Sequence, residues 1–393
     1  MDLSFGEEHE AFRREVVGFL ETHREAGARS GRQAALEWQR LLIEQGYAGR
    51  TIPKAYGGHG AEPDILKSRI IAEEFAWAQV STGLGGQGIS MLIPTLLEVG
   101  SEEQRRQFIG PTLRGETVWC QGYSEPGAGS DLANLRTKAE LDGDEWVING
   151  QKIWTSTAHL ADWIFCLVRT EPDAPKHQGI SFLLFSMKTP GIEIRPLIDM
   201  TGGHSFNEVF FTDVRVPAGQ IVGKRGDGWK VANAILRHER GSLADPNTML
   251  SRLNAMKTLM RNETLDGRRV IDDPVFRDRL MAIEGRVMAM RCNDLRLLSG
   301  ALNGHDTSLA GMIVKLETTE LRHDLEGLAI DVMGEFGLIY GEDAPQLRNN
   351  GSWQWNYMFF LGLIIGGGTS QIQKNIIAER GLGMPREPKL APA

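Results

Sequence analysis

The chain has 393 residues, a formal net charge of −8 and an isoelectric point near 5.7. This acidic balance disfavours nucleic acid and anionic membrane surfaces as partners, and the length suits two or three compact layers around a sizeable core. The three cysteines, Cys120, Cys166 and Cys292, lie far apart in the sequence. They indicate free thiols in a reducing compartment, and not a disulfide framework or a metal site.

The N-terminal region has the pattern of an acidic amphipathic helix and lacks the pattern of a secretory signal. The most apolar run, Met358–Gly368, is shorter than the roughly 18 residues that indicate a membrane span. These two features predict a cytoplasmic protein of bacterial type that does not enter a membrane.

Residues 1–115 show the periodicity of amphipathic helices. Ser4 and Glu7 are spaced as a capping box for the first helix, and Ser101 and Gln104 as another for the fifth. This stretch therefore predicts an N-terminal all-α domain. The helices expected between the two capping boxes are Leu36–Gln45, Ile65–Trp77 and Thr82–Val99.

Between residues 116 and 225 the periodicity changes to two, which is typical of half-buried strands. Asp142-Gly143 is a hairpin signal. Short, evenly spaced strands predict a small β-barrel or sandwich, and without alternating strands and helices the glycines of this region are no Rossmann fingerprint. The strands expected after the hairpin signal are Trp146–Ile148, Trp163–Val168, Ile180–Phe185, Ile192–Ile194 and Glu208–Val214.

Residues 226–393 return to longer helices, which predict a C-terminal helical bundle. Pro246 cannot sit comfortably inside a helix, so the first of these helices is expected to break or bend just after Leu243. The whole chain is therefore expected to be an α+β protein. The expected helices are Trp229–Leu243, Pro274–Leu302, Thr307–Met333, Ser352–Ile365 and Gln371–Arg380.

Residues 119–137 contain a loop of small residues, Pro126 to Ser130, that directly follows a strand-like segment. Such a loop can bring its backbone N–H groups close to a flat or anionic ligand, because glycine has no Cβ. Tyr123 and Ser124 add two hydroxyl groups. Taken alone, this pattern also fits an ordinary turn between two strands.

Three segments in register resemble the acyl-CoA dehydrogenase family of flavoproteins. They are Cys120–Asp131, which contains Ser-Glu-Pro-Gly-Ala-Gly-Ser-Asp, Asn149–Ser156, and Gly368–Arg380. The resemblance covers nearly the whole chain and implies a helical N-terminal domain, a middle β domain and a C-terminal helical bundle. It also implies FAD as cofactor.

The resemblance implies roles for individual residues. FAD would be bound by residues of all three segments and by an arginine that reaches a neighbouring subunit's FAD, with Arg269 weakly favoured over Arg268. Ser130, Arg240 and Gly368 would contact the substrate, and the N–H of Gly367 would hold its thioester carbonyl. A helix cap for Thr369 and a solvated surface arginine for Arg240 are the alternatives. The implied FAD contacts are Tyr123, Ser124, Gly129, Trp154, Thr155, Ser156, Arg269, Thr369 and Gln371.

The catalytic base is expected to be Glu239. Most family members carry this glutamate directly before Gly-Thr-Ser, where this chain has Gly367. A branch that includes isovaleryl-CoA and long-chain acyl-CoA dehydrogenases carries it on an earlier helix before an arginine, as in Glu239-Arg240. Glu239 also shares a helical face with three apolar residues, Trp229, Ala232 and Leu236, where burial would raise its pKa toward that of a general base. A solvated glutamate paired with a neighbouring arginine is the alternative.

The expected reaction is α,β-dehydrogenation of an acyl-CoA, with electrons passing to an electron-transferring flavoprotein. Gly367 leaves room near the reacting carbons, which favours a branched or bulky acyl group. A homo-oligomer, dimer or tetramer, is typical of the family. Asp331 to Gly337 departs from the family's subunit-contact motif, so one alternative is that this chain is a non-catalytic or half-competent subunit of a hetero-oligomeric acyl-CoA dehydrogenase. A flavin oxidase on the same fold is another.

Overall fold

The computed structural model describes residues 6–242, 246–305, 307–341, 344, 346–386 and 388, without the side chains of residues 240–242, 246–247 and 308–309. The chain forms two compact units. Unit 1 comprises Met1–Asp199 and Gly203–Glu239, and unit 2 comprises Met200–Gly202 and Arg240–Ala393. The expected domain limits at residues 115/116 and 225/226 stay predictions.

The N-terminal part of unit 1 is helical, as expected. Helix α2 ends at Gly46, whose left-handed backbone (φ 76°) suits glycine, and the Asp64 side chain caps α3. The Ser101–Gln104 capping box is present in full, whereas Ser4 lies outside the described residues. The helices are α1 (Glu7–Ala28), α2 (Arg32–Gln45), α3 (Ile65–Ala78), α4 (Ile93–Val99), α5 (Glu102–Gln104) and α6 (Gly110–Leu113), with π-helical turns η2 (Gly88–Leu92) before α4 and η3 (Arg105–Ile109) between α5 and α6.

The helix expected from Thr82 begins five residues later, at Gln87. Gly83 and Gly86 have φ values of 101° and 107°, which are incompatible with a right-handed helix. The expected start at Thr82 was therefore wrong, because the glycines of this segment favour a loop.

The strands of unit 1 form one seven-stranded sheet in the described part of the chain, in the order β1-β4-β2-β3-β7-β6 with β5 on β4. The predicted hairpin joins β2 to β3 through a two-residue turn at Gly143 (φ 65°) and Asp144. β1 pairs with β4 in parallel, and the other long pairings are antiparallel. The strands are β1 (Trp119–Gly122), β2 (Lys138–Asp142), β3 (Glu145–Lys152), β4 (Trp163–Arg169), β5 (Ile180–Ser186), β6 (Ile192–Leu197) and β7 (Phe206–Pro217).

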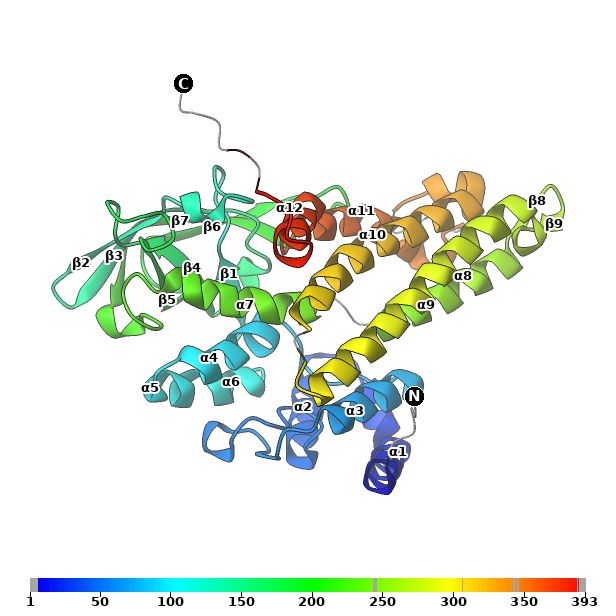
Figure 1. Ribbon diagram of the computed structural model, residues 1–393, viewed down its shortest axis with the longest axis horizontal. Helices are drawn as coiled ribbons and strands as arrows, with labels where there is room; N and C mark the ends of the chain where they lie inside the picture. Colours follow the sequence, from blue (N-terminus) through cyan, green and yellow to red (C-terminus); the bar gives the residue numbers. More distant parts are fainter. Residues whose placement is uncertain are drawn as a thin grey trace. The chain divides into compact units, whose positions relative to one another are not determined.

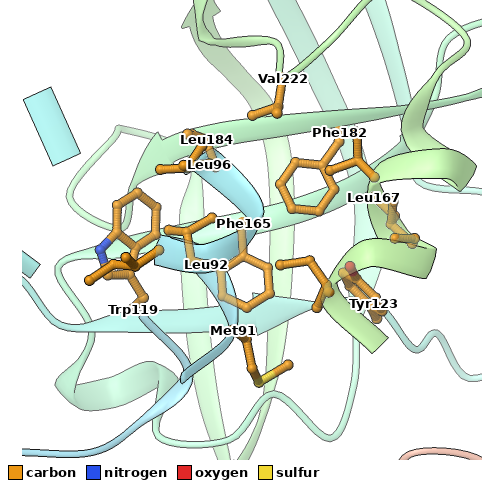
Figure 2. Packing of buried hydrophobic residues seen from close by; sticks show 14 of the residues in the cluster. Met91, Leu92, Leu96, Trp119, Tyr123, Phe165, Leu167, Phe182, Leu184 and Val222 are labelled. Atoms are coloured by element: carbon orange, nitrogen blue, oxygen red, sulfur yellow. The ribbon is translucent and has the colours of Figure 1, made fainter. Parts of the chain in front are cut away.

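A single apolar cluster joins this sheet to α4, η3 and the helix α7 (Gly228–Ser242). Figure 2 shows Tyr123 at its edge, near Phe165 and Phe182. Both phenylalanine rings meet the Tyr123 ring edge-on. The cluster therefore fixes the ring of Tyr123, the residue that follows β1.

All three cysteines are free, as expected, and only Cys292 is exposed. Burial raises the pKa of the Cys120 thiol, and it raises that of Cys166 to about 12. We expect one thiol per native chain to react rapidly with an aromatic disulfide reagent at pH near 8, and three after unfolding. Release of the coloured thiolate measures both counts. A Cys292→Ser variant should show no rapid phase, and rapid reaction of a second thiol in the native protein would contradict the expectation.

Unit 2 is mainly helical, and Figure 1 shows α8, α9 and α10 side by side. A short hairpin, β8 (Thr264–Leu265) with β9 (Arg268–Arg269), connects α8 to α9. Among the described residues, no helix is both long and apolar enough to cross a membrane. The helices are α8 (Pro246–Asn262), α9 (Pro274–Leu302), α10 (Ser308–Met333), α11 (Ser352–Ile365) and α12 (Ser370–Ile376).

Helix α7 is described to Ser242 and α8 from Pro246, so the break expected just after Leu243 falls at residues 243–245, which lie outside the described residues. Helix α8 itself was not expected. Proline at the first position of a helix loses no hydrogen bond and has a suitable φ, which is compatible with Pro246 as the first described residue of α8.

Candidate active site

The loop after β1 is a tight turn fixed by its own backbone. The N–H of Glu125 donates to the carbonyl of Ala128, and the N–H of Ala128 to the carbonyl of Glu125, both at 3.0 Å. Gly129 and Ser130 follow as exposed residues. A Cβ at Gly129 would meet nothing within 4 Å, so the packing of the described chain gives no reason for glycine there. Glycine at this position would instead be required if a ligand lay close to the backbone.

A buried ion pair holds the base of this loop. The ammonium of Lys152, at the end of β3, lies 2.8 Å from a carboxylate oxygen of Glu125 and donates to the carbonyl of Tyr123 at 3.2 Å. The Glu125 carboxylate also accepts from the backbone N–H groups of Arg136 (2.6 Å) and Thr137 (2.9 Å). Burial alone would raise the pKa of Glu125, but the charge of Lys152 and these hydrogen bonds together hold that pKa below its ordinary value.

The Trp154–Ser156 segment lies beside the same loop. The N–H of Ile153 donates to the carbonyl of Ser124 at 2.9 Å. Trp154 has a left-handed backbone (φ 59°), which is uncommon for a residue with a side chain, and its indole is 58% exposed. The two segments that resemble flavin-binding motifs thus meet in unit 1. The exposed indole of Trp154 follows shortly after β3, beside the Tyr123–Ser130 loop.

Thr155 is held by a residue that the sequence analysis missed. Asn207, on β7, exchanges both backbone hydrogen bonds with Thr155 (3.0 and 3.1 Å), and its side chain donates to the Thr155 carbonyl at 3.0 Å. The hydroxyl of Thr155 is buried, and no described residue offers it a hydrogen-bond partner. A single buried asparagine has no sequence signature, so only the fold could have revealed it.

Glu239 lies near the loop, on α7. Buried apolar residues of the same helix, Ala232 and Ile235, continue the expected apolar face, and Glu239 itself is half-buried. Burial raises the pKa of the Tyr123 phenol well above its usual range, and the negative charge of Glu239 raises it further. The Tyr123 hydroxyl is buried and makes no well-formed hydrogen bond to the described residues, although an interaction with the Gln121 side chain lowers the pKa of the phenol slightly against these two effects. The fold therefore brings the expected base to the expected cofactor loop.

Arg237 does not neutralise Glu239 but holds a different carboxylate. It donates to both oxygens of Glu98 at 2.8 and 2.9 Å, which ties α7 to α4. The side chain of Arg240 lies outside the described residues. A pairing of Glu239 with a neighbouring arginine stays the alternative.

In unit 2, the segment from Gly366 to Thr369 links α11 to α12. Gly367 and Gly368 have left-handed backbones, with φ values of 64° and 98°. The Thr369 hydroxyl accepts from the N–H of Ile372 at 3.2 Å, which makes it the cap of α12. Gln371 is exposed. Thr369 therefore caps α12, and its contact with FAD stays a prediction.

The two candidate arginines of the β8–β9 hairpin differ. Arg269 pairs with Asp272 at 2.8 Å, whereas Arg268 has no hydrogen-bond or ion-pair partner within the described part of unit 2. Asp331, the acidic residue of the altered segment, pairs with Arg279 at 2.7 Å. Its charge is therefore compensated within the chain. No group of three or more potential metal ligands lies together among the described residues.

Comparison with known proteins agrees with these features. Family models for the acyl-CoA dehydrogenase N-terminal, middle and C-terminal domains match residues 6–116, 120–214 and 226–382. The chain is 41% identical over 360 residues to acyl-CoA dehydrogenase IpdE1 of Mycobacterium tuberculosis, covering 90% of this chain and 88% of that protein. It belongs to the acyl-CoA dehydrogenase family.

Among solved structures, the Tcur3481-Tcur3483 steroid ACAD has a TM-score of 0.81 at 30% identity. The ChsE4-ChsE5 complex from Mycobacterium tuberculosis has a TM-score of 0.80 at 31% identity. Each comparison covers 98% of this chain and 100% of the other. The expected fold is confirmed: an N-terminal helical domain, a middle β half-barrel and a C-terminal helical domain. The protein is an acyl-CoA dehydrogenase, an oxidoreductase of a family that uses FAD.

Proposed function

We propose that this acyl-CoA dehydrogenase binds FAD at the Tyr123–Ser130 loop and the Trp154–Ser156 segment, and that Glu239 removes the α-proton of the substrate. One observation carries the proposal. The hydroxyl of Tyr123, on the expected cofactor loop, is buried without a hydrogen-bond partner among the described residues and lies within the field of the Glu239 carboxylate.

The residues present fit FAD. Two buried hydroxyl groups, those of Tyr123 and Thr155, need a partner that the described chain does not supply. Gly129 leaves its backbone open, and Trp154 offers an exposed ring for stacking against a flat heterocycle. When bound, FAD supplies the acceptor for the β-hydride. Ser124 and Ser156 complete the proposed contacts to the flavin ring. The phosphates and adenosine of FAD are proposed to be bound by Thr369, Gln371 and an arginine of the β8–β9 hairpin.

Two groups of the chain are proposed to act on the substrate thioester. The Gly367 N–H has no partner among the described residues and is proposed to donate to the thioester carbonyl, which stabilises the enolate as the α-proton leaves. Glu239 takes that proton through its carboxylate, as in the branch with the base on the earlier helix. Ser130, Arg240 and Gly368 are proposed to contact the remaining part of the acyl-CoA.

For the hairpin arginine, the ion pairs favour a revision. Arg269 is held by Asp272, whereas Arg268 has a guanidinium available for a phosphate. We therefore propose Arg268 in place of Arg269 as the residue that reaches a neighbouring subunit's FAD.

The substrate is proposed to be a CoA thioester with a bulky, ring-bearing acyl group. Gly367 places no side chain where most relatives have the base, which leaves room near the reacting carbons. One similar structure is described as a steroid ACAD. Because similar structures include a complex of two different chains, ChsE4 and ChsE5, assembly with a second, related chain is proposed alongside a homo-oligomer. An electron-transferring flavoprotein is the proposed acceptor.

An anaerobic titration tests this proposal. The purified protein is mixed with CoA esters of straight, branched and ring-bearing acids, and the flavin absorbance is followed. We expect a yellow protein that is bleached by a ring-bearing ester and not by short straight-chain esters. Bleaching by straight-chain esters alone would contradict the bulky substrate. A colourless protein that gains flavin only with a co-expressed relative would support the hetero-oligomer, and oxygen consumption without an added acceptor would indicate an oxidase.

A further inference from the structure

Lys315, in the first third of α10, is a fully buried lysine whose ammonium contacts the turn between α11 and α12. It donates to the carbonyl of Gly368 at 2.7 Å and to the carbonyl of Ile364 at 3.3 Å. Ile364 belongs to the last turn of α11, where carbonyls lack helical partners and a cation is favoured. One side chain thus bridges both ends of the glycine turn.

This turn has little conformational preference of its own. It consists of Gly366, Gly367 and Gly368, and glycine has the largest backbone freedom of all residues. Gly368 lies against Gln373, whose side-chain nitrogen would be 2.7 Å from an added Cβ. The same amide donates to the carbonyl of Gly367 at 3.1 Å. The conformation of the turn is therefore imposed by Lys315 and Gln373.

Among the described residues, the hydrogen bonds leave the N–H groups of Gly367 and Gly368 and the carbonyl of Gly366 open. The carbonyls of Gly367 and Gly368 are occupied, and the N–H of Gly366 donates to Gly362 at 2.8 Å. The Gly367 N–H donates to no group in the described part of unit 2. It is the donor assigned above to the thioester carbonyl.

We propose that Lys315 is a positioning residue for enolate formation. It holds the glycine turn so that the Gly367 N–H points at the thioester oxygen, and it places a buried positive charge next to the site where negative charge develops. The inference rests on the proposed role of Gly367. It assigns the orientation of the oxyanion donor to a lysine on a different helix, 52 positions earlier in the chain than Gly367.

Lys315 could instead act only as a structural cap for α11. The two roles differ in what a substitution changes. A structural cap affects unfolding and binding of all ligands alike, whereas a positioning residue weakens the enolate form of a bound thioester selectively. A test must therefore measure the enolate directly.

Acetoacetyl-CoA is a suitable probe, because this 3-oxoacyl thioester ionises to an enolate with its own ultraviolet absorbance and has no simple α,β-dehydrogenation product. The purified holoenzyme is titrated with it at neutral pH, and CoA itself is titrated as the reference. We expect Lys315→Met to lower the affinity for the enolate form about tenfold to 100-fold, with the dissociation constant of CoA changed less than about twofold. Lys315→Gln keeps a donor without the charge and should lie between.

Lys374→Met is the matched control, because Lys374 is an exposed lysine on α12 near the same turn. It should leave enolate binding unchanged. Should Lys315→Met fail to fold, Lys315→Gln decides the question. Unchanged enolate affinity in a folded, flavin-containing Lys315 variant would overturn the inference. If the wild-type protein bound acetoacetyl-CoA only in its keto form, the proposed function itself would be wrong.

Discussion

Replacing Glu239 by glutamine is expected to lower kcat by about 10³-fold to 10⁴-fold, which is the upper range of general-base catalysis. Glutamine preserves the size of the side chain but cannot accept the α-proton. The fold should be unaffected, because Glu239 is only half-buried and the packing of α7 depends on residues such as Ala232 and Ile235. The measurement is the single-turnover rate of flavin bleaching without oxygen, with flavin content and melting temperature measured in parallel.

Glu98→Gln is the matched control, since Glu98 on α4 binds Arg237, which lies on the same helix as Glu239. It changes the attachment of α7 without removing the proposed base, and kcat should stay within about threefold, as expected for a partly exposed ion pair. An equal loss in both variants would mean that Glu239 acts only by placing α7.

A second variant tests the position of the base. In Glu239→Gln combined with Gly367→Glu, the carboxylate stands where most family members carry it, and part of the activity should return. Recovery is expected to be incomplete, because the left-handed backbone of Gly367 (φ 64°) disfavours a side chain by about 1–2 kcal/mol. Full activity of the single Glu239→Gln variant would place the base elsewhere.

Replacing Lys152 by methionine is expected to lower the free energy of unfolding by about 3–5 kcal/mol, because it leaves the Glu125 carboxylate buried without its cation. The carbonyl of Tyr123 loses a donor in the same step. The Tyr123–Ser130 loop should therefore loosen, and affinity for FAD should fall together with stability. Denaturant unfolding of the apoprotein and fluorescence titration with FAD measure the two effects.

The double variant Glu125→Gln with Lys152→Met shows how much of the loss comes from leaving the Glu125 charge unpaired. It should be more stable than Lys152→Met alone, since no unpaired charge remains. Lys138→Met is the control, because Lys138 is an exposed lysine on β2. If the double variant were less stable than Lys152→Met, the buried charge of Glu125 would not be the cause of the loss.

The pair also makes stability depend on pH. The pKa of Glu125 is lower in the folded chain than its usual value, so the unfolded chain binds the proton more tightly. The stabilisation is present above the unfolded pKa of about 4.3 and is lost as the pH falls through the folded pKa. Glu125→Gln should remove this contribution to acid unfolding.

Much of the candidate site could be predicted from the sequence because its residues occur in long contiguous segments. Tyr123 to Ser130 and Trp154 to Ser156 were expected to act together, and the structure joins them through Ile153 and Ser124. Glu239 was predicted from helical spacing and family resemblance, and the fold brings it near Tyr123. Its role as base stays a prediction.

The supporting residues could not be predicted. Lys152 and Lys315 are lysines, which are rarely buried without a partner, and their partners are a carboxylate 27 positions away and backbone carbonyls about 50 positions away. Such pairings depend on strand order and helix packing, which spacing within one segment does not encode. Helix α8 was missed for a local reason, because Pro246 was interpreted only as a helix breaker, although proline also suits the first position of a helix.

The strand order of the middle sheet also bears on how the enzyme assembles. The β2–β3 hairpin needs only a two-residue turn, whereas β1 pairs with β4 across a long stretch of chain, with Trp119 opposite Trp163. Closing the longer loop costs more chain entropy, so local hairpins form before such non-local pairs. The Tyr123–Ser130 loop directly follows β1, so we expect it to reach its final conformation only after β1 has paired with β4. FAD would then bind only chains in which the sheet is complete. It would raise the yield of native protein by mass action, without increasing the rate at which β1 pairs with β4.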